Sequence, residues 1–376
     1  MKKSFVFGVA APEYNFIGRE KETSRLITNF ESGVNTILIS PRRWGKTSLV
    51  SHVCGKMRDN SDVLIVRLDI FSCRSEYDFY NQFAAAVLKQ TATKKDQWLE
   101  NAREFLVRLS PMISFRPDPS TDFNLSLGIT PKTHTPEEIL ELPETIARKR
   151  GKRIVVCIDE FQQISELPDA KTIQRKLRTV WQHQELTSYC LYGSKKHLMS
   201  MMFQSRDHAF YHFGDVLFLG KIPTEEWVKY ICQHFADNNK TISEELASKI
   251  CGLVDNHSSY VQQLSWNVIN MTEDGENVTD DIVDAALDDL INVNESLFLQ
   301  QIAPLTNYQI NFLRALADGV TTGFGEKNIR ENYSLGAPSN IKRLKDSLEN
   351  RELISVEGKT VTLTDPVFLL WLCRTL

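Results

Sequence analysis

Five short runs of β-branched and other apolar residues constrain the fold of this chain more than any other feature. The runs span residues 36–40, 63–70, 154–159, 188–193 and 215–220. Helical stretches separate them, and this alternation is typical of a mostly parallel sheet with helices on both faces. The sequence therefore predicts an α/β core in the first part of the chain.

The connection from Ile70 to Ile154 is far longer than one crossover between parallel strands requires. Within it, a turn rich in Pro, Asp and Ser is flanked by alternating apolar residues, which is typical of a hairpin. We therefore expect a hairpin insertion at about residues 110–130.

The second half of the chain is predicted to be mainly helical, because apolar residues recur at helical spacing from Thr224 onward. Thr279 is the expected N-cap of one of these helices. The tail pattern predicts three helices and then two strands around a Glu-Gly-Lys turn, which is a winged helix-turn-helix. The expected domains are residues 1–222, 223–300 and 301–376.

Charge is unevenly distributed, although the whole chain carries a net charge of only −4. Residues 1–223 hold 32 basic and 25 acidic side chains, residues 224–300 hold 3 and 15, and residues 301–376 hold 9 and 8. The seven cysteines show no CxxC or Cys/His metal spacing, which fits a reducing interior. No apolar run approaches the roughly 20 residues of a membrane span. We expect a cytoplasmic protein that does not enter membranes.

A phosphate-binding loop is indicated by the stretch TILISPRRWGKTSLV. The pattern G-x-x-x-x-G-K-[ST] uses its lysine on phosphate and its hydroxyl on Mg²⁺. Gly45, Lys46 and Thr47 supply its last three positions, whereas Ser40 replaces the leading glycine. That glycine provides conformational freedom and no ligand, so a small serine is compatible with the loop. The expected nucleotide-binding loop is Pro41, Arg42, Arg43, Trp44, Gly45, Lys46, Thr47 and Ser48.

Acidic and polar residues that follow the third and fourth runs indicate hydrolysis as well as binding. Asp159 ends an apolar strand, where it is expected to hold Mg²⁺ together with Thr47. Glu160 follows at once and is expected to orient or deprotonate an attacking water. Ser194 ends the fourth run and is a candidate sensor of the γ-phosphate, although a simple turn explains it almost as well. With Lys46, these residues form the expected catalytic set.

The chain resembles the archaeal-type P-loop ATPases, a STAND branch of signal-transduction ATPases related to the AAA+ class. The residues that carry the resemblance read NFIGREKE, PRRWGKTSL, CIDEFQQI, YGSKKHLM and LTDPVFLLWL. The resemblance implies a P-loop sheet, a helical lid domain and a winged helix, with ATP or ADP and Mg²⁺ as ligands. It also implies that Phe16, Ile17 and Arg19 contact the base and ribose, which favours ATP over GTP.

The chain departs from the family pattern at several positions. Family members often carry an arginine just before the fifth strand, whereas His212 stands there, and a neutral histidine is a poor clamp for the γ-phosphate. The lid turn carries no Gly-x-Pro sequence. These departures imply that turnover can be slow. Arg42 and Arg43 either compensate electrostatically or anchor the loop to neighbouring carboxylates, and the sequence favours neither.

The winged-helix tail leaves two interpretations open. Asn340, Lys342, Arg343 and Lys345 lie at the start of the third tail helix, where a recognition helix meets base edges in duplex DNA. Interleaved acidic residues oppose this interpretation, because duplex binding depends on a clearly positive face. A clamp that binds a partner protein is the alternative.

Three functions are therefore compared. An ATP-driven switch whose state is read by the tail or a partner ranks first. A DNA-binding regulator with a largely structural nucleotide ranks second. A translocating ring motor ranks third, because no trans-acting arginine or pore loop can be identified in the sequence. The oligomeric state stays open.

Overall fold

The computed structural model describes residues 5–91 and 135–375. The expected hairpin insertion at about residues 110–130 lies outside the described residues. The chain forms two compact units. Unit 1 comprises Met1–Gly18, Arg43–Gly45 and Lys221–Leu376, and unit 2 comprises Arg19–Arg42 and Lys46–Gly220. The three-domain division expected from the sequence stays a prediction.

A five-stranded sheet forms the centre of unit 2, with the strand order β2-β3-β4-β1-β5. The strands are β1 (Thr36–Ile39), β2 (Val63–Asp69), β3 (Arg153–Asp159), β4 (Thr187–Gly193) and β5 (Asp215–Phe218). Every pairing between them is parallel. The predicted parallel sheet is confirmed. Because all five strands run in one direction, the residues that follow their carboxyl ends meet at a single edge.

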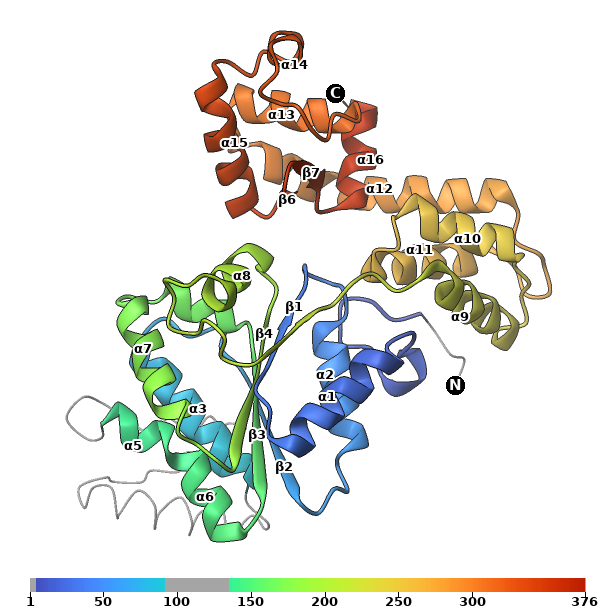
Figure 1. The fold of residues 1–376 in the computed structure, drawn as a ribbon. Helices are drawn as coiled ribbons and strands as arrows, with labels where there is room; N and C mark the ends of the chain where they lie inside the picture. The colour runs from blue at the N-terminus through green and yellow to red at the C-terminus, as the bar shows by residue number, and fades with distance from the viewer. Residues whose placement is uncertain (1–4, 92–134, 376) are drawn as a thin grey trace, which may run out of the picture. The chain divides into compact units, whose positions relative to one another are not determined.

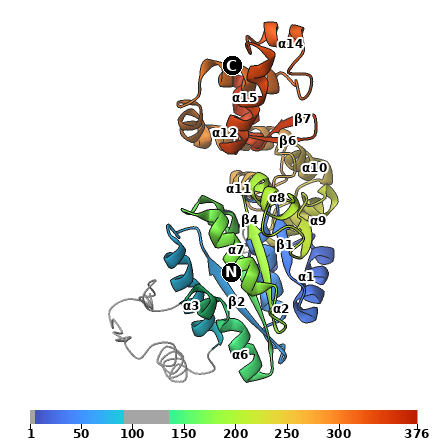
Figure 2. The same ribbon diagram turned by 60° about the vertical axis from the view of Figure 1, so that its left-hand side comes forward.

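Helices cover both faces of this sheet (Figures 1 and 2). Helices α1 (Glu20–Ser32) and α2 (Lys46–Lys56) lie on one face. The opposite face carries α3 (Glu76–Thr91), α5 (Pro136–Leu140), α6 (Leu142–Arg150), α7 (Ala170–Trp181) and α8 (Lys196–Gln204). Phe161 and Ile164 of η2 (Phe161–Glu166) belong to the same buried cluster as these helices. Burial on both faces explains why the strands read as continuous apolar runs.

Alternate residues of the central strands supply a buried core on one face of the sheet. Ile154, Val156 and Ile158 of β3 belong to one buried cluster, which also contains Trp181. The indole ring of Trp181 stacks on Tyr189, with ring centroids 3.9 Å apart. This aromatic packing fixes the C-terminal end of α7 against the first residues of β4.

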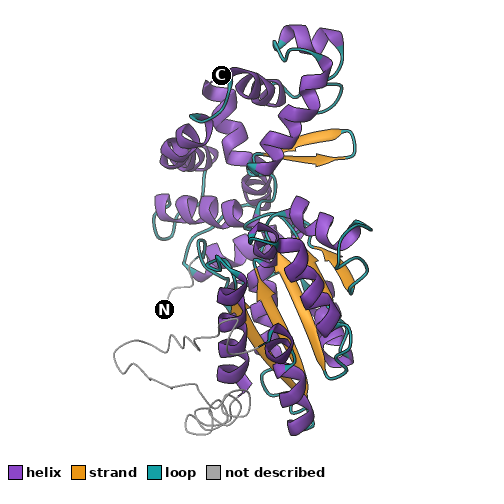
Figure 3. Cartoon of the chain, turned by 90° about the vertical axis from the view of Figure 1, so that its left-hand side faces the viewer, coloured by secondary structure: helices purple, strands orange, loops and turns teal. Residues whose placement is uncertain are grey.

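Unit 1 is mainly helical and has one continuous buried core. Its helices are η1 (Glu13–Asn15), α9 (Thr224–Asp237), α10 (Glu244–Leu253), α11 (Ser258–Met271), α12 (Asp280–Ile302), α13 (Asn307–Ala317), α14 (Lys327–Asn332), α15 (Pro338–Asn350) and α16 (Pro366–Thr375). Its two strands, β6 (Ile354–Glu357) and β7 (Thr360–Leu363), pair antiparallel (Figure 3). Three helices followed by a hairpin are consistent with the predicted winged helix.

The helix caps observed in unit 1 are formed by residues typical of N-caps. The Thr279 side chain accepts a hydrogen bond from the amide of Ile282 at the start of α12, which confirms the predicted N-cap. Thr306 and Gln309 form a reciprocal capping box at the start of α13. All seven cysteines are free thiols. No helix in residues 5–91 or 135–375 combines the length and the apolar content needed to cross a membrane.

Candidate phosphate-binding and catalytic site

The lysine of the loop is folded back onto the loop's own first residues. Lys46 is only 6% exposed. Its ammonium group donates to the carbonyls of Ser40, at 2.8 Å, and Pro41, at 2.9 Å. The hydroxyl of Ser40 lies 3.3 Å from the same nitrogen. Serine in place of the leading glycine therefore adds a contact to the lysine.

Ser40 does not need the conformational freedom of glycine. Left-handed backbone angles occur later in the loop, at Arg43 with φ 63° and at Gly45 with φ 93°, and Ser40 is not among the residues with positive φ. Gly45 thus occupies the position where glycine is favoured. The chain then enters α2, whose N-terminal end favours anions. The Ser40 substitution is compatible with a phosphate-binding loop.

Thr47 and Asp159 meet at the edge of the sheet. The Thr47 hydroxyl donates to Asp159 Oδ2 at 2.8 Å, and the amide of Glu160 donates to Asp159 Oδ1 at 2.8 Å. Burial raises the pKa of the Asp159 carboxyl to about 6, although both hydrogen bonds act in the opposite direction. A hydroxyl and a carboxylate are the hard oxygen ligands that Mg²⁺ prefers. These two residues fit a magnesium site.

Glu160 has a strained backbone and an anchored carboxylate. Its φ of 53° is left-handed, which is unusual for a residue with a side chain. Oε2 accepts a hydrogen bond from Ser194 Oγ at 3.0 Å and another from Gln162 Nε2. Arg42 Nε donates to Ser194 Oγ at 3.3 Å. The structure therefore brings Glu160, Ser194 and Arg42 of unit 2 together.

Gln162 is a residue of this site that the sequence analysis did not single out. It lies in the stretch that carries the family resemblance, but nothing in that stretch shows which face of η2 it occupies. Gly193, at the end of β4, lies directly against it. No sequence pattern links the two residues, because they come from different elements and meet only through side-chain packing.

The expected base and ribose contacts divide between the two units. Phe16 is half-buried, and Ile17 packs against the core of unit 1. Arg19 is 4% exposed, and its guanidinium donates to the carbonyl of Gly220 at 2.7 Å and to Glu22 at 3.2 Å. Its charged group is thus engaged with the protein itself. A ribose contact from Arg19 stays a prediction that would require this arrangement to change.

The structure does not bring His212 to the phosphate loop of its own chain. His212 is exposed and precedes β5, which begins at Asp215. Asp215 pairs with Thr36 at the start of β1, whereas the phosphate loop follows the end of β1 at Ile39. His212 therefore lies at the opposite edge of the sheet from Lys46.

The tail residues expected to contact DNA differ in their surroundings. Lys342 and Arg343 are exposed on α15. Asn340 donates to the carbonyl of Leu335 at 3.0 Å, and the Lys345 ammonium lies 5.4 Å from the ring centroid of Phe324. Arg343 in turn donates to Asn340 Oδ1 at 2.9 Å. The tail itself thus engages Asn340, Arg343 and Lys345, although Arg343 stays exposed.

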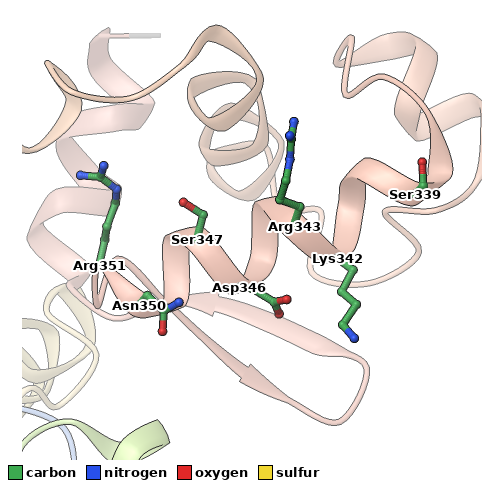
Figure 4. A pocket seen from close by; sticks show the side chains of 7 residues that line it. All are labelled: Ser339, Lys342, Arg343, Asp346, Ser347, Asn350 and Arg351. Carbon is green, nitrogen blue, oxygen red and sulfur yellow. The ribbon is translucent and has the colours of Figure 1, made fainter. Parts of the chain in front are cut away.

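A groove with a volume of about 610 Å³ runs along α15 (Figure 4). It is lined by Ser339, Lys342, Arg343, Asp346, Ser347, Asn350 and Arg351. Lys342 and Asp346 extend on the side of the β6–β7 hairpin, and Arg343 and Arg351 extend on the opposite side. Three cationic side chains and one carboxylate therefore line the groove.

No protein-family model matches the chain, and no curated protein matches it. Among solved structures, the Walker-type ATPase paby2304 of Pyrococcus abyssi matches with a TM-score of 0.68 at 16% identity, over 98% of this chain and 99% of that one. The ORC2 protein of Aeropyrum pernix, solved as ADPNP-ADP complexes, matches with a TM-score of 0.58 at 15% identity, over 98% and 96%. Aeropyrum pernix ORC1 in complex with DNA matches with a TM-score of 0.50 at 13% identity, over 96% and 93%. The chain therefore has the P-loop ATPase fold that these Walker-type and ORC proteins share.

Proposed function

We propose that this protein binds ATP with Mg²⁺ and hydrolyses it to ADP and phosphate. One observation carries the proposal: a phosphate-loop lysine, a Thr47–Asp159 pair and an anchored Glu160 lie together where the parallel strands of unit 2 end. Ligands of α/β sheets bind at this edge. The solved structure of an ORC protein of the same fold with adenine nucleotides also supports the choice of ATP.

Each residue has a defined part in the proposed reaction. Lys46 carries the positive charge that attracts the phosphates, and Thr47 and Asp159 provide the oxygen ligands for the metal. When bound, Mg²⁺ neutralises charge on the phosphate oxygens. Glu160 orients a water and accepts its proton as the water oxygen bonds to the γ-phosphorus and the bond to the ADP oxygen breaks. Ser194, which touches the same carboxylate, is placed to sense the γ-phosphate.

Removal of magnesium tests this assignment. We expect the native chain to release phosphate from ATP, and we expect excess EDTA to lower the rate by at least about 100-fold, because a metal ion contributes several kcal/mol of charge stabilisation. Phosphate release is measured before EDTA, after EDTA and after magnesium is restored. Hydrolysis that continues unchanged in EDTA would rule out the Thr47–Asp159 metal site.

We further propose that the nucleotide state controls a switch that the tail or a partner protein reads. The alternative is a DNA-binding regulator with a largely structural nucleotide. The groove on α15 favours a test of DNA, because Lys342, Arg343 and Arg351 line it. ORC1, a solved protein of similar fold, is in complex with DNA. The tail's 9 basic and 8 acidic residues argue for weak binding at most.

Reversing the charge of Lys342 and Arg343 together should weaken duplex DNA binding at low salt by roughly tenfold or more, because each lost phosphate contact removes counterion release. The measurement is a fluorescence-anisotropy titration of a duplex at two salt concentrations. Lys229→Glu with Lys327→Glu is the matched control, since both lysines are exposed and lie outside α15. Equal losses in the two double variants would indicate a general charge effect. No binding by the native chain would remove the DNA-regulator alternative.

A further inference from the structure

Gln162 is a buried amide with an uneven set of hydrogen bonds. It lies in η2, two residues after Glu160, and is only 2% exposed. Its Nε2 donates to Glu160 Oε2. Its Oε1 has no hydrogen-bond partner among the described residues. A buried carbonyl oxygen without a partner is unfavourable, so an amide retained in such a place needs an explanation.

Gly193 provides the space that this amide occupies. A Cβ atom at Gly193 would lie 1.9 Å from Gln162 Oε1 and 3.1 Å from its Cδ. The φ angle of Gly193 lies outside the left-handed region, so its backbone does not require glycine. Glycine is therefore required at position 193 for steric reasons, because the side chain of any larger residue would displace the Gln162 amide.

The orientation of the amide follows from the charge beside it. If the amide were turned by 180°, its carbonyl oxygen would face the Glu160 carboxylate. Both groups only accept hydrogen bonds, so this arrangement would be repulsive. The Glu160 carboxylate therefore selects the orientation with Nε2 toward itself, and Oε1 is left in the space beside Gly193.

The two oxygens of Glu160 are held differently as a result. Oε2 receives hydrogen bonds from Gln162 and, at 3.0 Å, from Ser194. Oε1 receives no hydrogen bond from any residue in the described ranges 5–91 and 135–375. Two donors on one oxygen fix the direction of the carboxylate and leave its second oxygen to accept from water.

We propose that Gln162, in the space left by Gly193, is a positioning residue that fixes the Glu160 carboxylate for attack of water on ATP. This inference rests on the proposed role of Glu160 as the group that orients and deprotonates water. Gln162 contacts Glu160 and is not itself expected to touch the nucleotide. Its effect should therefore appear in kcat and not in the affinity for nucleotide.

Gln162→Ala should lower kcat roughly 10- to 100-fold, because a misplaced catalytic group loses about this much. The dissociation constants for ATP and ADP with magnesium should stay within about twofold of the native values. Gln163→Ala is the matched control, because the Gln163 side chain donates to the carbonyl of Cys73 and not to Glu160. The readouts are steady-state phosphate release and calorimetric titration, with thermal unfolding to confirm that each variant is folded.

A double substitution tests the role of Gly193. Gly193→Ala alone should lower kcat as Gln162→Ala does, because the new methyl group displaces the amide. Added to Gln162→Ala, it should have little further effect, since no amide remains to be displaced and the methyl group then meets the flexible side chain of Met199, whose Sδ would lie 3.1 Å away. Additive losses would mean that Gly193 acts independently of Gln162 and would overturn this part of the proposal.

The outcomes also separate this inference from the proposed function. If the native chain hydrolyses ATP and Glu160→Gln stops it, yet Gln162→Ala keeps native kcat, the positioning role is wrong and the ATPase assignment survives. A Gln162→Ala variant that loses nucleotide affinity in proportion to kcat also contradicts the positioning role. If the native chain does not turn over ATP, the proposed function fails and the inference fails with it.

Discussion

Replacing Lys46 with alanine should weaken the binding of ATP and ADP by at least about 100-fold, because hydrogen bonds from a charged donor contribute about 1.5–3 kcal/mol each and Lys46 can supply more than one. Its ammonium group is buried and already rests on the carbonyls of Ser40 and Pro41. Removing it takes away the positive charge and also leaves both carbonyls without this donor. Alanine should therefore remove the charge that attracts phosphate and also weaken the conformation of the loop.

Calorimetric titration of ADP and ATP at millimolar magnesium measures this loss. Lys56→Ala is the matched control, because Lys56 is an exposed lysine at the end of the same helix. The control should bind both nucleotides like the native chain. Native affinity in Lys46→Ala would show that this loop does not hold the phosphates, and the proposed function would then fail at its first step.

The sheet could be predicted because its signal is local. Each strand reads as a short apolar run, and the run TILIS is found as β1 (Thr36–Ile39) with both of its neighbours parallel. The site edge follows from the same pattern, because residues after the carboxyl ends of parallel strands must meet. Thr47 and Asp159 are distant in sequence, yet the pattern predicts that both lie near this edge, and the structure joins them by a hydrogen bond.

Contacts that depend on side-chain packing could not be predicted. Gln162 and Gly193 come from different elements, and no pattern in either element indicates that an amide fills the space beside the glycine. The surroundings of Arg19 were equally hidden in the sequence: the resemblance implies a ribose contact, whereas the fold buries its guanidinium against the carbonyl of Gly220. Packing decides such contacts, and periodicity reports only which face a residue occupies.

The position of His212, in contrast, could have been predicted, because the order of the strands in the sequence shows at which end of the sheet it lies. In a parallel sheet, residues before the strands lie at the amino ends of the strands, and residues after the strands lie at the carboxyl ends, on the opposite side of the sheet. His212 precedes β5, and the phosphate loop follows β1, so the two belong to opposite edges. The family resemblance suggests a nucleotide contact for His212 from its position along the chain, whereas the direction of β5 places it away from the phosphate loop.

Replacing Glu160 with glutamine should lower the rate of ATP hydrolysis by roughly 100- to 10,000-fold, the contribution of a positioned general base. Glutamine has the same length, and its carbonyl oxygen can still accept from Ser194 and Gln162, so the local packing should be kept. Its amide cannot take a proton from water. Nucleotide affinity should therefore stay within about twofold of native, as expected when only the transition state loses an interaction.

Single-turnover phosphate release and calorimetric titration of the same Glu160→Gln preparation separate the two effects. Glu31→Gln is the control, because Glu31 is an exposed carboxylate of α1, and it should hydrolyse ATP like the native chain. Normal turnover in Glu160→Gln would remove Glu160 as the base. In that case Ser194 and Gln162 would bind a carboxylate with a structural task, and the left-handed backbone at Glu160 would have to be explained by the start of η2 alone.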